Sequence, residues 1–139
     1  MQKKTASKIY FIGGGDLISG RLKSIDKRYL DEAMPKKILV LDLTTNNPEK
    51  IKKYKSFLYE YFTGLGAEEV LFASSLNQQE TLSAFESVGV VYLPGGNTIT
   101  LLDNLKRRNL VQQLKSFRGI IVGNSAGALV LSDIVIITN

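Results

Sequence analysis

Short apolar segments recur along the chain, each rich in β-branched or aliphatic side chains. Within a segment the apolar positions follow one another almost without interruption instead of alternating with polar ones. Such runs are typical of strands that are buried on both faces, as in a parallel sheet. We therefore expect strands at Lys8–Ile12, Lys37–Leu41, Glu69–Phe72, Val88–Leu93, Gly119–Val122 and Ile134–Thr138.

In most of the intervals between these segments, apolar residues recur at the spacing of a helix. The clearest helix begins with Asn47 as N-cap and Pro48 in the first turn, and it continues with apolar residues on one face. Asn77 and Asn97 can cap two further helices. A weaker helical pattern covers Leu17–Ala33.

Strands that alternate with helices predict an α/β fold with a doubly wound, mainly parallel sheet and helices on both faces, in flavodoxin-like layers. A chain of 139 residues with 44% hydrophobic residues can bury one such core, so we expect a single α/β domain over residues 1–139. No apolar run approaches the roughly 20 residues that span a bilayer, and the N-terminal segment lacks the apolar region of a signal peptide. These features predict a cytoplasmic protein that does not contact membranes.

Two residue types that often carry catalysis are missing from the sequence. There is no Cys, which excludes a disulfide framework, a thiolate metal site and a thiol nucleophile. There is also no His, the usual general base near neutral pH, so an enzyme that relies on one must find it elsewhere. The net charge of +5 is scattered along the chain, which favours a solvated mixed surface over nucleic-acid binding. We predict no cofactor and no metal site.

Glycine-rich loops follow three of the predicted strands, at Gly13–Asp16, Pro94–Thr98 and Gly123–Gly127. The carboxyl ends of parallel strands share one edge of an open sheet, and ligands bind in the crevice outside that edge. The loops therefore predict one shared site. The first loop does not have the spacing of a dinucleotide-binding motif, and a tight structural turn explains its glycines equally well.

The third loop places Ser125 between a buried strand and a helix that begins at Ala126, with Gly123 and Gly127 two residues to either side. This is the G-x-S-x-G pattern of a nucleophile elbow, in which small residues let strand and helix approach each other closely. We expect Ser125 in a strained turn with its hydroxyl facing the crevice, and the helix N-terminus aimed at any oxyanion that forms. The alternative is a glycine-rich turn whose serine only caps the helix.

The second loop offers backbone donors beside this serine. Gly95 and Gly96 leave their N–H groups unobstructed, so either can donate to an oxyanion together with the N–H of Ala126. Asn97 then caps the helix that begins at Thr98. The competing interpretation is a Pro-Gly-Gly turn followed by an ordinary capped helix.

The successive motifs IYFIGGGD, VVYLPGGNTITLLDNL and IIVGNSAGALVLS resemble the peptidase E and cyanophycinase group of serine peptidases (family S51), which share the fold of class I glutamine amidotransferases. The resemblance covers nearly the whole chain. It implies Ser125 as nucleophile, with Ala126 and Gly96 as oxyanion donors, and it implies a peptidase for short peptides, including dipeptides with an N-terminal Asp. We expect neighbouring positions of the loops to bind the peptide, namely Gly95, Asn97 and Asn124.

The sequence departs from that group beyond the elbow. The catalytic His and acid of the group lie there, whereas the one acid after Ser125 in this chain is Asp133, too close in sequence to be the triad carboxylate. We expect a domain that is incomplete at its C-terminal end, whose open sheet edge would allow homo-oligomers. The alternative is an inactive or truncated relative that binds small anions or peptides as an assembly module. Recognition of an N-terminal Asp requires a cation, but the loops contain none, and Arg21 is the nearest.

Overall fold

The computed structural model describes residues 7–14 and 17–137, with the side chains of the last helix as far as Ile134. These residues form five strands, all parallel, in the order β1-β5-β4-β2-β3. The strands are β1 (Lys8–Ile12), β2 (Lys37–Val40), β3 (Glu69–Phe72), β4 (Val90–Leu93) and β5 (Ile120–Asn124). The helices are α1 (Lys23–Glu32), α2 (Pro48–Gly64), α3 (Gln78–Ser87), α4 (Thr98–Arg107), α5 (Val111–Ser116) and α6 (Ala126–Ile137), with a short 3-10 turn at Ala73–Ser75.

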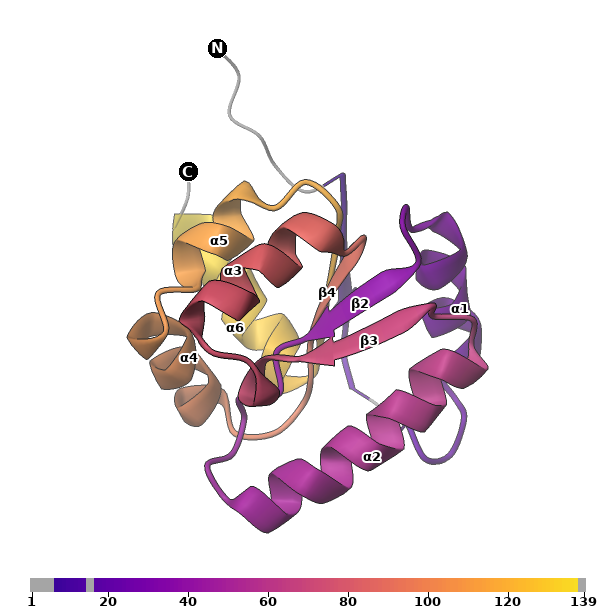
Figure 1. Ribbon diagram of the computed structural model, residues 1–139, viewed down its shortest axis with the longest axis horizontal. Helices are drawn as coiled ribbons and strands as arrows, with labels where there is room; N and C mark the ends of the chain where they lie inside the picture. Colours follow the sequence, from indigo (N-terminus) through magenta and orange to yellow (C-terminus); the bar gives the residue numbers. More distant parts are fainter. Residues whose placement is uncertain (1–6, 15–16, 138–139) are drawn as a thin grey trace.

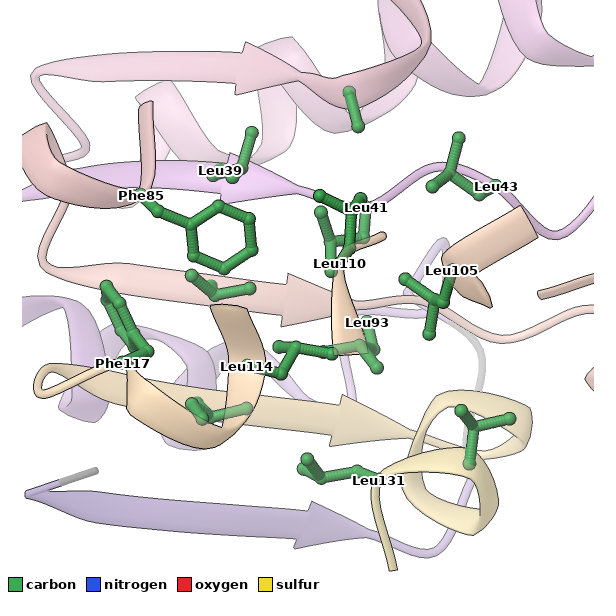
Figure 2. Close-up of a cluster of buried hydrophobic side chains, with 14 of the residues drawn as sticks. Leu39, Leu41, Leu43, Phe85, Leu93, Leu105, Leu110, Leu114, Phe117 and Leu131 are labelled. Atoms are coloured by element: carbon green, nitrogen blue, oxygen red, sulfur yellow. The ribbon is translucent and has the colours of Figure 1, made fainter. Parts of the chain in front are cut away.

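The sheet is covered on both faces, as the doubly wound prediction requires. Helices α1 and α2 lie on one face, and α3 to α6 lie on the other (Figure 1). Alternate residues of a strand point to opposite faces, so each strand contributes to two cores. Leu39 of β2 enters the core beneath α3 to α6, while Ile38 and Val40 enter the core beneath α1 and α2. Figure 2 shows the first of these cores, where leucines of the sheet meet leucines of the helices and the rings of Phe85 and Phe117.

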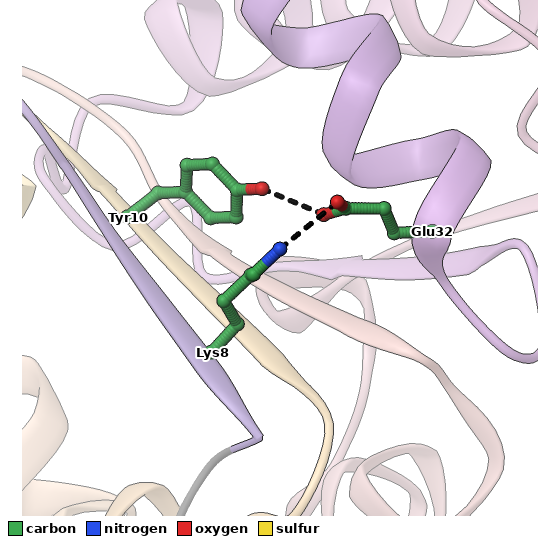
Figure 3. A network of polar contacts seen from close by, with 3 residues as sticks. All are labelled: Lys8, Tyr10 and Glu32. Atoms are coloured by element: carbon green, nitrogen blue, oxygen red, sulfur yellow. Dashed lines mark hydrogen bonds and ion pairs between the residues drawn. The ribbon is translucent and has the colours of Figure 1, made fainter.

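Strand β1 forms one edge of the sheet and is less buried than its neighbours. Every residue of β4 and β5 is buried, whereas in β1 only Ile12 is. Two side chains of β1 reach the end of α1 (Figure 3): Lys8 Nζ lies 2.9 Å from Glu32 Oε2, and the Tyr10 hydroxyl donates to Glu32 Oε1 at 2.6 Å. The hydrogen bonds from Tyr10 and Lys8 lower the pKa of Glu32. These contacts tie the edge strand to the first helix.

A buried carboxyl group, Asp26, joins α1 to α2. It accepts a hydrogen bond of 2.7 Å from the Tyr29 hydroxyl and another from the hydroxyl of Tyr61, which belongs to α2. Burial raises the pKa of Asp26, and the two hydrogen bonds oppose that rise. Burial also raises the pKa of both tyrosines, so both remain donors over the physiological range.

The helices begin where their capping residues predict. The Asn47 side chain accepts hydrogen bonds from the N–H groups of Glu49 and Lys50, and Asn77 forms a capping box with Glu80. These local bonds satisfy N–H groups that have no partner within a helix. No helix in the described ranges is long and apolar enough to cross a membrane.

The predicted strand at Ile134–Thr138 is wrong. Helix α6 continues from the elbow through Ile137, and Thr138 lies outside the described residues. The segment is apolar nearly all round, so its run of β-branched residues has the composition of a buried strand as well as that of a buried helix. Val130, Leu131 and Ile134 lie on one side of the helix by their spacing, and all three are buried in the core beneath α3 to α6.

Candidate active site

A single residue, Ser125, joins strand β5 to helix α6. Its φ is 56°, a left-handed conformation that costs a non-glycine residue about 1 kcal/mol or more, and its side chain is exposed. The flanking glycines permit this turn. A Cβ on Gly123 would lie 2.8 Å from the carbonyl oxygen of Gly127, and a Cβ on Gly127 would lie 2.0 Å from that of Leu93. The strained turn expected from the G-x-S-x-G pattern is confirmed.

The backbone on both sides of Ser125 is fixed by hydrogen bonds. Its N–H donates to the carbonyl oxygen of Ile12 in β1 at 2.8 Å, and its own carbonyl accepts from Leu129 at 3.1 Å. The N–H of Ser125 is therefore engaged. The next N–H belongs to Ala126, the first residue of α6, and it has no acceptor among the described residues. This is the donor that an oxyanion near Ser125 can use.

The loop after β4 packs directly against the elbow. A Cβ on Gly95 would lie 3.4 Å from Cβ of Ser125 and 3.9 Å from its Oγ. Gly96 has a φ of 136°, and a Cβ there would lie 2.6 Å from Thr44 Oγ1, so only glycine fits between these neighbours. Within the described ranges the N–H of Gly96 has no acceptor, and the side chain of Asn97 caps α4 by accepting from Thr100 at 2.9 Å.

A cavity of about 960 Å³ opens beside the serine. Its walls come from the loops that follow β1, β2, β4 and β5 and from one side of α2, which brings together the carboxyl ends of neighbouring strands. The described residues that line it are Leu17, Ile18, Thr44, Thr45, Asn46, Lys50, Lys53, Tyr54, Phe57, Gly95, Gly96, Asn97, Thr100, Asn124 and Ser125.

The second and third glycine loops thus share one site, as predicted. Of the first loop, predicted at Gly13–Asp16, Gly13 and Gly14 do not line the cavity, and Gly15 and Asp16 lie outside the described residues. The prediction that the first loop shares the site does not hold for its described glycines, and Leu17 and Ile18, which follow the loop, add apolar surface to the cavity instead.

The wall formed by the β2–α2 loop is held in place by a buried amide. Asn104 of α4 donates through Nδ2 to the carbonyl oxygen of Leu43 at 2.8 Å and to Oδ1 of Asn46 at 3.1 Å. Because Leu43 and Asn46 flank the two threonines that line the cavity, this contact sets the position of that wall.

Asn124 also lines this cavity. Its side chain is buried, and Nδ2 donates to the Tyr92 hydroxyl at 3.3 Å. Its Oδ1 has no hydrogen-bond partner in the described part of the chain. A buried acceptor without a partner is uncommon in folded proteins and marks a place where a ligand donor or a water can bind.

Lys50 and Lys53 are the charged side chains among the described residues that line the cavity, and the sequence prediction did not include them. That prediction sought a cation in the three glycine loops, and Arg21, the nearest by sequence, does not line the cavity. The available signal was the helix after Lys37–Val40, since it starts from the same edge of the sheet. Tyr54 lies beside the lysines, and burial, followed by the charge of Asp42, raises its pKa to about 12, so its hydroxyl is a donor.

The cavity is lined by the Ser125 hydroxyl and by backbone donors, but its described lining contains no His and no carboxylate that could act as a general base. The sequence has no His. Asp133 is exposed on α6, and eight residues of helix place it roughly 12 Å from Ser125 along the axis. The expectation that Asp133 cannot serve as the triad carboxylate agrees with this separation.

A parallel α/β sheet whose strand-to-helix elbow exposes a serine beside a glycine loop defines the class of nucleophile-elbow proteins. The sequence profile of peptidase family S51 matches residues 9–139, and the chain belongs to this family. The family-level resemblance seen in the sequence motifs is therefore confirmed.

Among solved structures, the chain is similar to the crystal structure of a peptidase from an acI-B1 Actinobacterium, with a TM-score of 0.74 and 20% sequence identity. At this identity the likeness shows the fold. The match covers 94% of this chain and 59% of that chain, so the chain spans about three fifths of the length of that peptidase. No curated protein matches the chain.

Proposed function

We propose that the chain is the nucleophile-bearing part of a serine peptidase that cleaves short peptides through Ser125. The observation that carries this proposal is the conformation of Ser125, which is strained, exposed and directed by two tightly packed glycines toward a cavity of peptide size. Backbone strain of this kind persists where the surrounding structure enforces it, and it clusters at active sites.

In the proposed reaction, Ser125 Oγ attacks the scissile carbonyl carbon, and its proton passes to a general base. The carbonyl π bond breaks, and the resulting oxyanion accepts hydrogen bonds from the N–H groups of Gly96 and Ala126. The base then protonates the leaving amine as the C–N bond breaks, which leaves an ester on Ser125 that water hydrolyses. We place the base, a His, outside these 139 residues, since the sequence contains none.

Substrate binding is proposed for the residues around this centre. Gly95 would contact the peptide backbone beside the scissile bond, and Asn97 would donate through Nδ2, because its Oδ1 is engaged in capping α4. Asn124, which lines the cavity directly before Ser125, would contact the peptide. The resemblance to the peptidase E group suggests dipeptides with an N-terminal Asp, in a cytoplasmic enzyme.

The lack of His in the sequence favours a second candidate function. Without a base of its own, the chain would be a non-catalytic binding or assembly module that holds a small anion or peptide in the same cavity. In that role a homo-oligomer could form through the β1 edge, where Phe11 is 53% exposed.

A serine-directed fluorophosphonate probe distinguishes the two candidates. We expect the 139-residue chain to label very slowly, because a serine hydroxyl without a base is a weak nucleophile. A form extended by the sequence that follows residue 139 in its gene should label at Ser125 and lose labelling in the Ser125→Ala variant. Failure of the extended form to label would overturn the peptidase proposal. Rapid labelling of the 139-residue chain would overturn the placement of the base outside it.

A further inference from the structure

The wall of the cavity that is formed by α2 carries positive charge. Lys50, Lys53, Tyr54 and Phe57 all line the cavity. They stand at positions i, i+3, i+4 and i+7 of one helix, so they share one face of it. Lys52 lies between them in sequence, is exposed, and is not part of the lining. Lys50 and Lys53, and not the neighbouring Lys52, thus line the same cavity as Ser125.

Neither of these two ammonium groups is neutralised by a described residue. Ion pairs in the described ranges join Lys8 to Glu32 and Lys27 to Asp31, and neither the Lys50 nor the Lys53 side chain has a hydrogen-bond or ion-pair partner there. None of the described lining residues is acidic. Two unpaired cations on the wall of a concave site attract an anionic ligand and raise its local concentration. The rest of the described wall is neutral, with hydroxyls, amides and apolar groups.

We propose that Lys50 and Lys53 are specificity-determining residues that select substrates with a carboxylate group. The inference rests on the proposed peptidase function, which makes the ligand a peptide, and a carboxylate is the anionic group that short peptides carry. It is either an acidic side chain or the C-terminal carboxylate. The rings of Tyr54 and Phe57 beside the lysines provide apolar surface for the carbon atoms next to that group.

Binding is measured separately from catalysis, so that the two proposals can fail independently. Isothermal titration calorimetry is performed at low salt on the Ser125→Ala chain with three dipeptides: Asp-Leu, Asn-Leu and Asp-Leu amide. The same titrations use Lys50→Gln, Lys53→Gln and the double variant, with Lys52→Gln as the matched control. That control removes the same charge from the same helix but outside the cavity. Ser125 labelling by a neutral fluorophosphonate is measured in parallel on the extended form.

We expect the double variant to bind Asp-Leu about tenfold more weakly, each single variant to lose roughly threefold, and Lys52→Gln to stay within about twofold. Affinity should also fall with added salt in the parent chain and much less in the double variant. Weak binding of Asn-Leu identifies the side-chain carboxylate as the recognised group, and weak binding of the amide identifies the terminal one.

The inference is overturned if both neutralised peptides bind as well as Asp-Leu, if Lys52→Gln weakens binding as much as the double variant, or if no dipeptide binds. Labelling of the extended form alongside any of these results would leave the peptidase proposal intact. Lysine-dependent binding without labelling of the extended form would leave the carboxylate site and remove the peptidase.

Discussion

Replacing Gly127 with Ala tests whether close backbone packing holds the elbow. The new Cβ would lie 2.0 Å from the carbonyl oxygen and 2.6 Å from the carbonyl carbon of Leu93. Since Cβ contacts below 3.0 Å essentially do not occur, α6 and β4 must separate by at least 1.0 Å, the difference of 3.0 and 2.0 Å. Both contacting atoms belong to the backbone, so no rotamer change relieves the clash. Overpacking a core costs about 1–3 kcal/mol, and we expect the upper end, about 3 kcal/mol.

Urea unfolding followed by circular dichroism measures this loss, which corresponds to a fall in Tm of roughly 10 °C for a chain of this size. Gly64→Ala is the matched control, because a Cβ there meets nothing within 4 Å. Gly64 ends α2 without a left-handed φ, so alanine should stabilise the protein by about 0.5 kcal/mol. The same substitution thus has opposite signs at the two positions. A Gly127→Ala variant as stable as the parent would refute the reasoning.

Three further predictions concern strain, charge and the cavity wall. Ser125→Gly should raise the free energy of unfolding by about 1 kcal/mol, because it removes the strain of a φ of 56°; no gain would mean that the turn is relaxed. Burial raises the folded-state pKa of Asp26 above its unfolded value, so the folded state binds more protons between the two and stability falls as pH rises from about 4. Asp26→Asn should flatten that decline in urea titrations at successive pH values, and an unchanged slope would contradict the assignment. Asn104→Asp should cost about 3 kcal/mol at pH 7, because a carboxylate cannot donate to the carbonyl of Leu43; chemical denaturation showing no loss would count against that buried bond.

Much of the fold could be predicted because its signals are local. Asn47, Asn77 and Asn97 cap helices within a few residues of their own position, and the apolar runs mark strands without knowledge of their neighbours. The strand order could not be predicted, since it depends on contacts between distant segments. Asn104, for example, is bonded to Leu43, 61 residues away. The continuation of the last helix through Ile137 was missed for another reason: an apolar segment without a polar face shows no period.

The residues of the candidate site also fall into those that a local motif predicts and those that only the fold brings together. The elbow at Ser125 and the loop at Gly95–Gly96 are visible as motifs because each combines a strand end with glycines. Lys50 and Lys53 carry no motif, and their helix meets the cavity only because β2 ends at the same sheet edge as β4 and β5. The unpartnered oxygen of Asn124 likewise becomes evident only when its neighbours are known.

The glycines around the elbow have a consequence for comparing relatives of this chain. Gly123 and Gly127 are required by contacts with backbone atoms of α6 and β4, and these contacts would be needed whether or not the protein cleaves a bond. A descendant without activity would therefore still carry the glycine pattern, because a side chain at either glycine would push α6 away from the sheet. The exposed side chain at position 125 is under no such restraint from packing. Active and inactive descendants of this fold should accordingly differ at that one position of the elbow long before the elbow itself disappears.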